Sequence, residues 1–168
     1  AIAGLWQSGE GTIYRPPPGD IFFLPQQPYM LIGSLRAQLL YPNNDTSIGD
    51  EQLLEVLEKV NLTELASRFG GLDVELDWEK VLSVGEQQRL AFARVLLARP
   101  RFAILDEATS ALDPANEAAL YRQLQETGTT LVSVAHRASI LKYHTQVLEL
   151  TGNCGWATHA ASRYRFSQ

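Results

Sequence analysis

Apolar and polar positions in the second half of the chain indicate strands and helices in alternation. An unbroken apolar run at residues 102–105 has the length of a buried strand, and further strands are expected at 130–135 (TLVSVA) and 146–150. Helices are expected at about 86–98, before a proline, and at 114–127, where a proline can occupy the first turn. Such alternation favours an α/β unit with a parallel sheet.

The first half of the chain is expected to contain short strands followed by helices. Residues 11–15 (GTIYR) and 21–24 (IFFL) indicate two strands. Leucines recur at helical spacing within residues 50–60, and the whole stretch 33–81 looks helical, so it is expected to form a separate lobe. The opening AIAGLW resembles the last turn of an apolar helix, which suggests an excerpt from a longer chain.

Composition narrows the functional classes. The 168 residues suffice for one domain with a core, and the net charge of −5 argues against a nucleic-acid or anionic-membrane surface. Cys154 is the only cysteine, so an internal disulfide is excluded and a reducing compartment fits. No apolar stretch approaches the roughly 20 residues that a membrane-spanning helix needs.

Two acids stand at the end of one predicted strand. Asp106 and Glu107 directly follow the run 102–105. Ligands of open parallel sheets bind beyond the carboxyl ends of the strands, and Mg²⁺ takes oxygen ligands. Asp106 is therefore a candidate metal ligand and Glu107 a candidate base for a water molecule. The alternative is a solvated strand end without function.

Polar residues also follow the neighbouring strands. Gln26 follows the run 21–24 and could ligate Mg²⁺ or orient a water, while His136 ends the strand 130–135 and could donate to a phosphate oxygen. Each residue alone is more often an ordinary polar side chain. We expect His136 to lie at the same sheet edge as Asp106 because parallel strands end together.

Two predicted helix starts contain residues that suit helix capping and could also have a function. Ser83-Val84-Gly85-Glu86 fits the capping box S-x-x-E, and a helix N-terminus with a glycine is also an anion site. Asp113, followed by a proline, is a favoured helix cap, which explains it structurally. A phosphate loop G-x-x-x-x-G-K-[ST] is absent from these 168 residues, since no lysine follows a glycine.

The order of these motifs resembles the nucleotide-binding domain of ATP-binding cassette (ABC) transporters. The chain contains PQQP, LSVGEQQR, FAILDEATSALD and VSVAHR in this order, and the resemblance covers about residues 1–150. FLPQQPYMLIGSLRAQLLYP and HRASILKYH resemble in particular half-transporters related to peroxisomal acyl-CoA exporters and bacterial permease/ATPase proteins. In that group, AIAGLWQSGEGTI directly follows the helix of the phosphate loop.

The resemblance implies an architecture and a set of roles. The fold would be α/β, a partial P-loop NTPase (RecA-like) parallel sheet with an inserted α-helical subdomain. It would comprise core residues 1–32, the helical subdomain 33–85, core residues 86–150 and a tail 151–168. The implied roles are the Q-loop glutamine for Gln26, the signature motif for Ser83, Val84, Gly85 and Glu86, the Walker B aspartate for Asp106, the catalytic base for Glu107, the D-loop aspartate for Asp113 and the switch histidine for His136.

The signature motif departs from the family pattern LSGGQ at two positions. Val84 replaces a glycine but can still offer its backbone N–H to a phosphate. Glu86 replaces a glutamine and would repel a phosphate that it faced. The capping box turns Glu86 back toward the Ser83 N–H instead, so we expect it to face the cap.

The resemblance also implies cofactors, partners and a location. ATP and Mg²⁺ would lie between two such domains paired head to tail, with a transmembrane domain fused N-terminally and the dimer on the cytoplasmic face of a membrane, in bacteria the inner membrane. The expected activity is ATP hydrolysis coupled to transport, with the isolated chain inactive because it lacks the phosphate loop. Its absence is also expected to expose apolar surface. Two alternatives remain: a non-catalytic remnant that docks on an ABC partner, and a soluble ABC ATPase of DNA maintenance.

Overall fold

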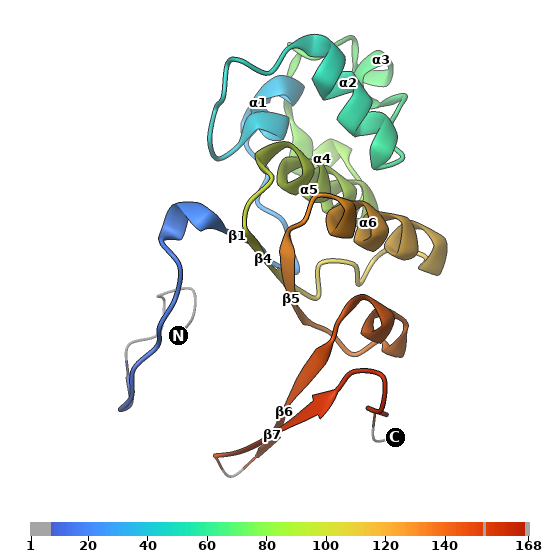
Figure 1. Cartoon of the computed structure of the whole chain (residues 1–168). Helices are drawn as coiled ribbons and strands as arrows, with labels where there is room; N and C mark the ends of the chain where they lie inside the picture. Colours follow the sequence, from blue (N-terminus) through green and yellow to red (C-terminus); the bar gives the residue numbers. More distant parts are fainter. Residues whose placement is uncertain (1–7, 153, 167–168) are drawn as a thin grey trace.

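Three parallel strands form the central sheet. The computed structural model describes residues 8–152 and 154–166, and its sheet has the order β1 (Ile21–Leu24), β4 (Phe102–Asp106), β5 (Thr130–Val134), with both pairs parallel. Leu24 is in register with Leu105, so the two strands end at the same edge. The expected α/β fold with a parallel sheet is confirmed (Figure 1).

One face of this sheet is the core of the molecule. Leu24, Ala103 and Leu105 alternate with outward positions along their strands and are fully buried. The long helix α5 (Val84–Ala98) packs against β1, and α6 (Pro114–Glu126) is joined to β5 by the Tyr121 hydroxyl, 3.0 Å from Ser133 Oγ.

The other face of the sheet leaves apolar side chains in contact with solvent. Phe23 of β1 is 39% exposed, and Val132 and Val134 of β5 are 43% and 52% exposed. Phe23 and Val132 are both in register with Ile104, so they lie in one row across the sheet. The alternation of a strand therefore puts a buried and a half-exposed apolar face back to back.

Helices dominate residues 33–81, but the stretch is not all-helical as expected. It contains α1 (Leu35–Leu40), α2 (Asp50–Lys59), α3 (Leu65–Phe69) and α4 (Trp78–Val81), grouped at one end of the molecule in Figure 1. In the same region β2 (Ile32–Ser34), just before α1, pairs antiparallel with β3 (Glu75–Asp77), just before α4. Each strand has three residues, too short for a period of two, and the Trp78 indole supports the pair by donating to Gly33 O at 2.7 Å.

The end of the chain forms a hairpin outside the parallel sheet. β6 (Gln146–Gly152) pairs antiparallel with β7 (Gly155–Ala160), so the predicted strand at 146–150 exists but does not extend the α/β alternation. A turn with Gly152 at φ 80° allows immediate pairing with β7, which the sequence did not reveal. Before the hairpin, residues Ala138–Tyr143 form the 3₁₀ helix η2.

The predicted strand at 11–15 is wrong. These residues have no regular structure and are largely exposed, and the short 3₁₀ helix η1 (Pro18–Asp20) follows them. A strand forms when a neighbouring strand pairs with its backbone, and no strand in the described part of the chain does so with this segment. The apolar opening at residues 1–6 lies outside the described residues. Within the described ranges, every helix is too short or too polar to cross a membrane.

Candidate functional site

Three predicted site residues meet beyond the carboxyl ends of the sheet strands. Gln26 follows β1, Glu107 follows β4, and His136 lies two residues past β5. Gln26 Nε2 donates to Glu107 Oε2 at 2.9 Å, and His136 Nε2 lies 3.0 Å from Glu107 Oε1. Both carboxylate oxygens of Glu107 are therefore engaged, each by a residue from a different neighbouring strand.

The backbone of Glu107 is turned into an unusual conformation. Its φ is 46°, in the left-handed region that non-glycine residues rarely adopt, while its N–H donates to Val134 O at 2.9 Å. The first residue past β4 is thus still tied to β5, and the reversal ends the strand there. Strained residues held by their surroundings concentrate at functional sites, which favours a chemical role for Glu107.

The contact between His136 and Glu107 fixes the position of one proton. An ionised carboxylate only accepts hydrogen bonds, so His136 Nε2 carries hydrogen in this contact. The His136 side chain is 84% exposed and that of Glu107 is 31% exposed. The site is therefore open to a ligand from solvent.

Asp106 occupies the exposed last position of β4, directly before Glu107. Among the described residues, no three acidic, histidine or cysteine side chains gather closely enough to hold a metal. Asp106 and the Gln26 amide oxygen supply hard oxygen donors of the kind Mg²⁺ takes, while the Gln26 nitrogen is used by Glu107. Mg²⁺ usually keeps several waters and phosphate oxygens, so two protein donors fit this cation when a phosphate completes its shell.

Ser83 and Glu86 form a separate group at the start of α5, and the predicted capping box is confirmed. Ser83 N–H donates to Glu86 Oε2 at 2.9 Å, and Glu86 N–H donates to Ser83 Oγ at 3.3 Å. Arg68 of α3 binds the other oxygen of Glu86 at 2.7 Å. Burial acts to raise the pKa of Glu86, but the hydrogen bonds from Ser83 and Arg68 outweigh it and lower the pKa.

The two residues inside this box have different surroundings. Val84 is exposed, and as the first residue of α5 it has a backbone N–H without a partner inside the helix. A Cβ on Gly85 would lie 3.3 Å from Ala111 O, so the glycine allows α5 to approach the loop after β4 closely. The first turn of α5 is thus exposed to solvent at Val84 and packed against the loop after β4 at Gly85.

Asp113 caps α6. Its Oδ1 accepts from the backbone N–H groups of Ala115 and Asn116, each at 3.0 Å, and its Oδ2 accepts from the Asn116 side chain. The Asn116 backbone and side chain hold the pKa of the Asp113 carboxyl below its usual range. Asp113 is joined to neither Glu107 nor Glu86, and helix capping explains its contacts in full.

Sequence reasoning missed a buried carboxylate that joins two loops of the site. Glu117 of α6 is only 2% exposed. It accepts from Thr109 Oγ1 at 3.0 Å, Ser139 Oγ at 2.5 Å and Arg137 Nη1 at 3.3 Å. The loop after β4 and the loop that carries His136 therefore share one anchor. The only sequence signal was an acid at a helix position whose neighbours at helical spacing are apolar.

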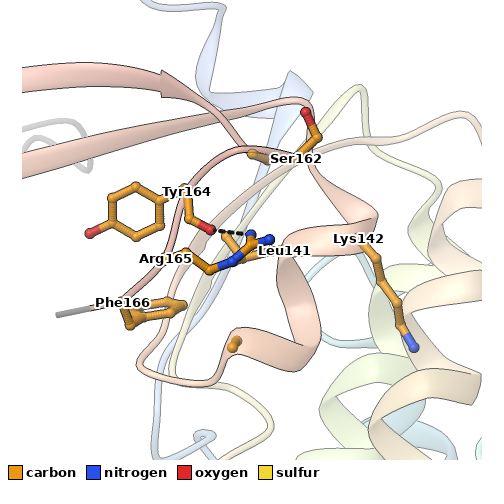
Figure 2. A pocket seen from close by; sticks show the side chains of 8 residues that line it. Leu141, Lys142, Ser162, Tyr164, Arg165 and Phe166 are labelled. Atoms are coloured by element: carbon orange, nitrogen blue, oxygen red, sulfur yellow. Dashed lines mark hydrogen bonds between the residues drawn. The ribbon is translucent and has the colours of Figure 1, made fainter. Parts of the chain in front are cut away.

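A surface hollow elsewhere does not belong to this site. It has a volume of about 390 Å³ and lies between η2 and the C-terminal segment, where Lys142, Tyr164, Arg165 and Phe166 line it (Figure 2). Arg165 Nη1 donates to Tyr164 O at 2.9 Å within it. None of the predicted site residues line this hollow, so volume alone does not identify the candidate site.

The chain is similar to ATP-binding proteins of ABC transporters. It is 57% identical over 156 residues to an uncharacterised ABC transporter ATP-binding protein of Synechocystis, which covers 93% of this chain and 24% of the relative. It is 44% identical to the chloroplastic ABC transporter D family member 2 of Arabidopsis thaliana (90% and 28% covered) and 43% identical to a human lysosomal cobalamin transporter (92% and 27% covered). The chain thus spans about a quarter of the length of the curated relatives it matches.

The fold has a counterpart among solved structures. A bacterial Atm1-family ABC exporter with ATP bound superposes with a TM-score of 0.66 and 25% sequence identity, over 77% of this chain and 23% of the exporter. The family model described as ABC transporter matches residues 1–110. This match covers more than half of the chain, so the chain belongs to the ABC transporter family.

Proposed function

We propose that this chain is part of the ATP-hydrolysing domain of an ABC transporter and that hydrolysis there drives transport across a membrane. One observation carries the proposal: Glu107 lies between Gln26 and His136 at the carboxyl edge of a parallel sheet. An acceptor between two donors at this edge suits a reaction that orients water against a phosphate. The proposed division is core 1–32, helical subdomain 33–85, core 86–150 and tail 151–168.

Glu107 is the proposed base. One of its oxygens accepts the proton of the attacking water while the water oxygen bonds to the γ-phosphorus and the bond from that phosphorus to the bridging oxygen breaks, which leaves ADP and phosphate. To accept this proton, Glu107 releases one of its two present donors. His136, whose side chain is 84% exposed, is the donor proposed to leave, and its Nε2–H is then free to donate to a γ-phosphate oxygen.

Asp106 and Gln26 are the proposed residues of the metal site. Bound Mg²⁺ would neutralise charge on the phosphate oxygens. Asp106 would hold this cation from the end of β4, and Gln26 would turn its amide oxygen toward it. The Gln26 amide nitrogen also donates to Glu107, so this one side chain would contact the metal and the base at the same time.

The first turn of α5 is proposed to serve a second copy of the domain. Ser83, Val84 and Gly85 would offer hydroxyl and N–H groups to an ATP held by the partner, with the domains head to tail. Glu86 would stay in its cap, bound to Ser83 and Arg68, and would keep its charge off the phosphate. Asp113 would lie near the dimer contact. A transmembrane domain, on whose cytoplasmic side the pair would sit, is the further proposed partner.

A chimera tests the proposed activity. Residues 8–168 would replace the matching segment of the Synechocystis relative, which is 57% identical, and Mg-ATP hydrolysis would be measured on the purified protein. We expect the chimera to hydrolyse ATP and Glu107→Gln to lower kcat by at least about 100-fold. A folded chimera whose kcat is unchanged by Glu107→Gln would show that the chain is not the source of the base.

A further inference from the structure

Gln88 of α5 contacts two loops of the candidate site at once. Its side chain is fully buried, and Nε2 donates to Gln26 O at 3.2 Å and to Ser110 Oγ at 3.1 Å. Its Oε1 accepts from Ala111 N–H at 3.0 Å. Both amide hydrogens and the amide oxygen are thus satisfied, and every partner lies outside α5.

These partners flank the residues that face each other in the site. Gln26 is held by its backbone carbonyl while its side chain donates to Glu107. Ser110 and Ala111 belong to the turn that starts at Glu107, where Ser110 N–H donates to Glu107 O at 3.0 Å. A single amide therefore anchors both sides of the contact between Gln26 and Glu107.

The close approach of α5 to this turn is independently built into the helix. Gly85 lies one helical turn before Gln88, and any Cβ there would press on Ala111 O at 3.3 Å. The same turn continues to the loop of His136, since Arg137 Nη2 donates to Ser110 O at 2.8 Å. The anchor thus reaches all three members of the cluster formed by Gln26, Glu107 and His136.

The neighbouring Gln87 shows that burial of an amide alone does not produce this arrangement. Gln87 is 5% exposed, and its Nε2 donates to Glu79 O and Leu82 O, both at 3.1 Å. These acceptors belong to the segment that enters α5, far along the chain from Gln26, Glu107 and His136. The two glutamines match in type, helix and burial but differ in what they hold.

We propose that Gln88 is a positioning residue that sets Gln26 opposite Glu107 by binding the Gln26 backbone and the 110–111 turn to one point on α5. This role in hydrolysis rests on the proposed function, but the coupling itself is a property of the chain without nucleotide. It links the start of α5, where a partner's nucleotide is proposed to bind, to the base. Motion of α5 on nucleotide binding would then be transmitted directly to Gln26.

Nuclear magnetic resonance on the 168-residue chain tests the coupling at the Gln26 side-chain amide, which Gln88 does not contact, and at the Ala111 N–H, which it does. The reporter is the separation in shift between the two Gln26 side-chain amide protons, which is larger when one hydrogen is bonded to Glu107 than in a solvated glutamine. We expect Gln88→Met to collapse this difference toward that of a solvated glutamine and to speed exchange of the Ala111 N–H by about tenfold or more. Gln87→Met, matched in burial and size, is expected to leave both signals as in the wild type.

A second variant keeps the test decisive if Gln88→Met does not fold. Gln88→Glu retains an acceptor for Ala111 N–H but removes the donor to Gln26 O. We therefore expect slow exchange of the Ala111 N–H to persist, and the separation of the two Gln26 amide proton signals to shrink. An unchanged Gln26 amide in a folded Gln88 variant, or an equal change in Gln87→Met, would overturn the proposal. Because no nucleotide is present, these results do not depend on whether the chain takes part in ATP hydrolysis.

Discussion

The Gln26 amide nitrogen donates to Glu107 Oε2 at 2.9 Å although the two residues are 81 positions apart in sequence. Parallel pairing of β1 and β4 puts Leu24 beside Leu105, so the residues that follow these strands emerge together. His136 binds the other oxygen of Glu107 at 3.0 Å. The carboxylate is thus positioned from both sides before any ligand arrives.

Removal of His136 is expected to impair hydrolysis. In the Synechocystis chimera, His136→Ala deletes a donor proposed to act on the γ-phosphate, so we expect kcat to fall by about 100-fold. The control is His159→Ala, because His159 forms a similar pair with Glu149 at 2.9 Å in the hairpin. Steady-state phosphate release measures both variants, and equal rates for them would argue against the role of His136.

Glycine at position 107 is expected to stabilise the chain while abolishing its chemistry. Glu107 has a φ of 46°, and glycine removes the strain of a left-handed residue, worth about 1 kcal/mol. The lost contacts to Gln26 and His136 are exposed and contribute little. Urea unfolding of the 168-residue chain should show a higher midpoint for Glu107→Gly but not for Glu107→Gln, which retains the strain. A lower midpoint for Glu107→Gly would contradict this view.

The Glu86 cap is expected to make stability depend on pH in the acid range. Contacts with Ser83 and Arg68 hold the folded pKa of Glu86 below its usual value of 4.5. The associated stabilisation is therefore complete above pH 4.5 and is lost as the pH falls through the lowered pKa. Urea unfolding at a series of pH values should show that the free energy of unfolding falls less in acid for Glu86→Gln than for the wild type. If the two proteins lose the same free energy as the pH falls, the cap does not make stability depend on pH.

The buried Glu117 is expected to be important for stability. Glu117→Ala removes the acceptor for Thr109, Arg137 and Ser139, and breaking such a buried polar group costs about 3 kcal/mol. Urea unfolding measures the loss, and Glu58→Ala, an exposed glutamate on α2, is the control with a change of less than about 0.5 kcal/mol. Similar losses for the two variants would mean that the Glu117 network is not a structural anchor.

The 168-residue chain alone is expected to bind Mg-ATP poorly. It has no G-K-[ST] sequence, so the backbone cradle and lysine for the β- and γ-phosphates are missing from these residues. Calorimetric titration of the folded chain with Mg-ATP should give no micromolar binding, whereas the chimera should bind. Micromolar affinity of the chain alone would mean that Gln26, Asp106 and the first turn of α5 suffice for nucleotide binding.

Elements whose sequence pattern is local could be predicted, whereas elements that depend on distant segments could not. The strand at 102–105 was predictable because an unbroken apolar run before two acids fits a buried strand that reaches the ligand edge. The Ser83 and Glu86 cap was predictable because a capping box lies within four residues. In contrast, β2 and β3 are three residues each and depend on pairing across the helices between them.

The sequence by itself determined the α/β alternation, the residues at the strand ends and the family, since these depend on local periodicity and on motifs in a fixed order. Only the tertiary structure decided that the last strand joins a hairpin and that Glu107 binds Gln26 and His136 simultaneously. It also decided that Gln88 and Glu117 anchor the loops around them. The physical reason is that a buried polar side chain must find its partners wherever the fold brings them, and no local pattern encodes segments far apart in sequence.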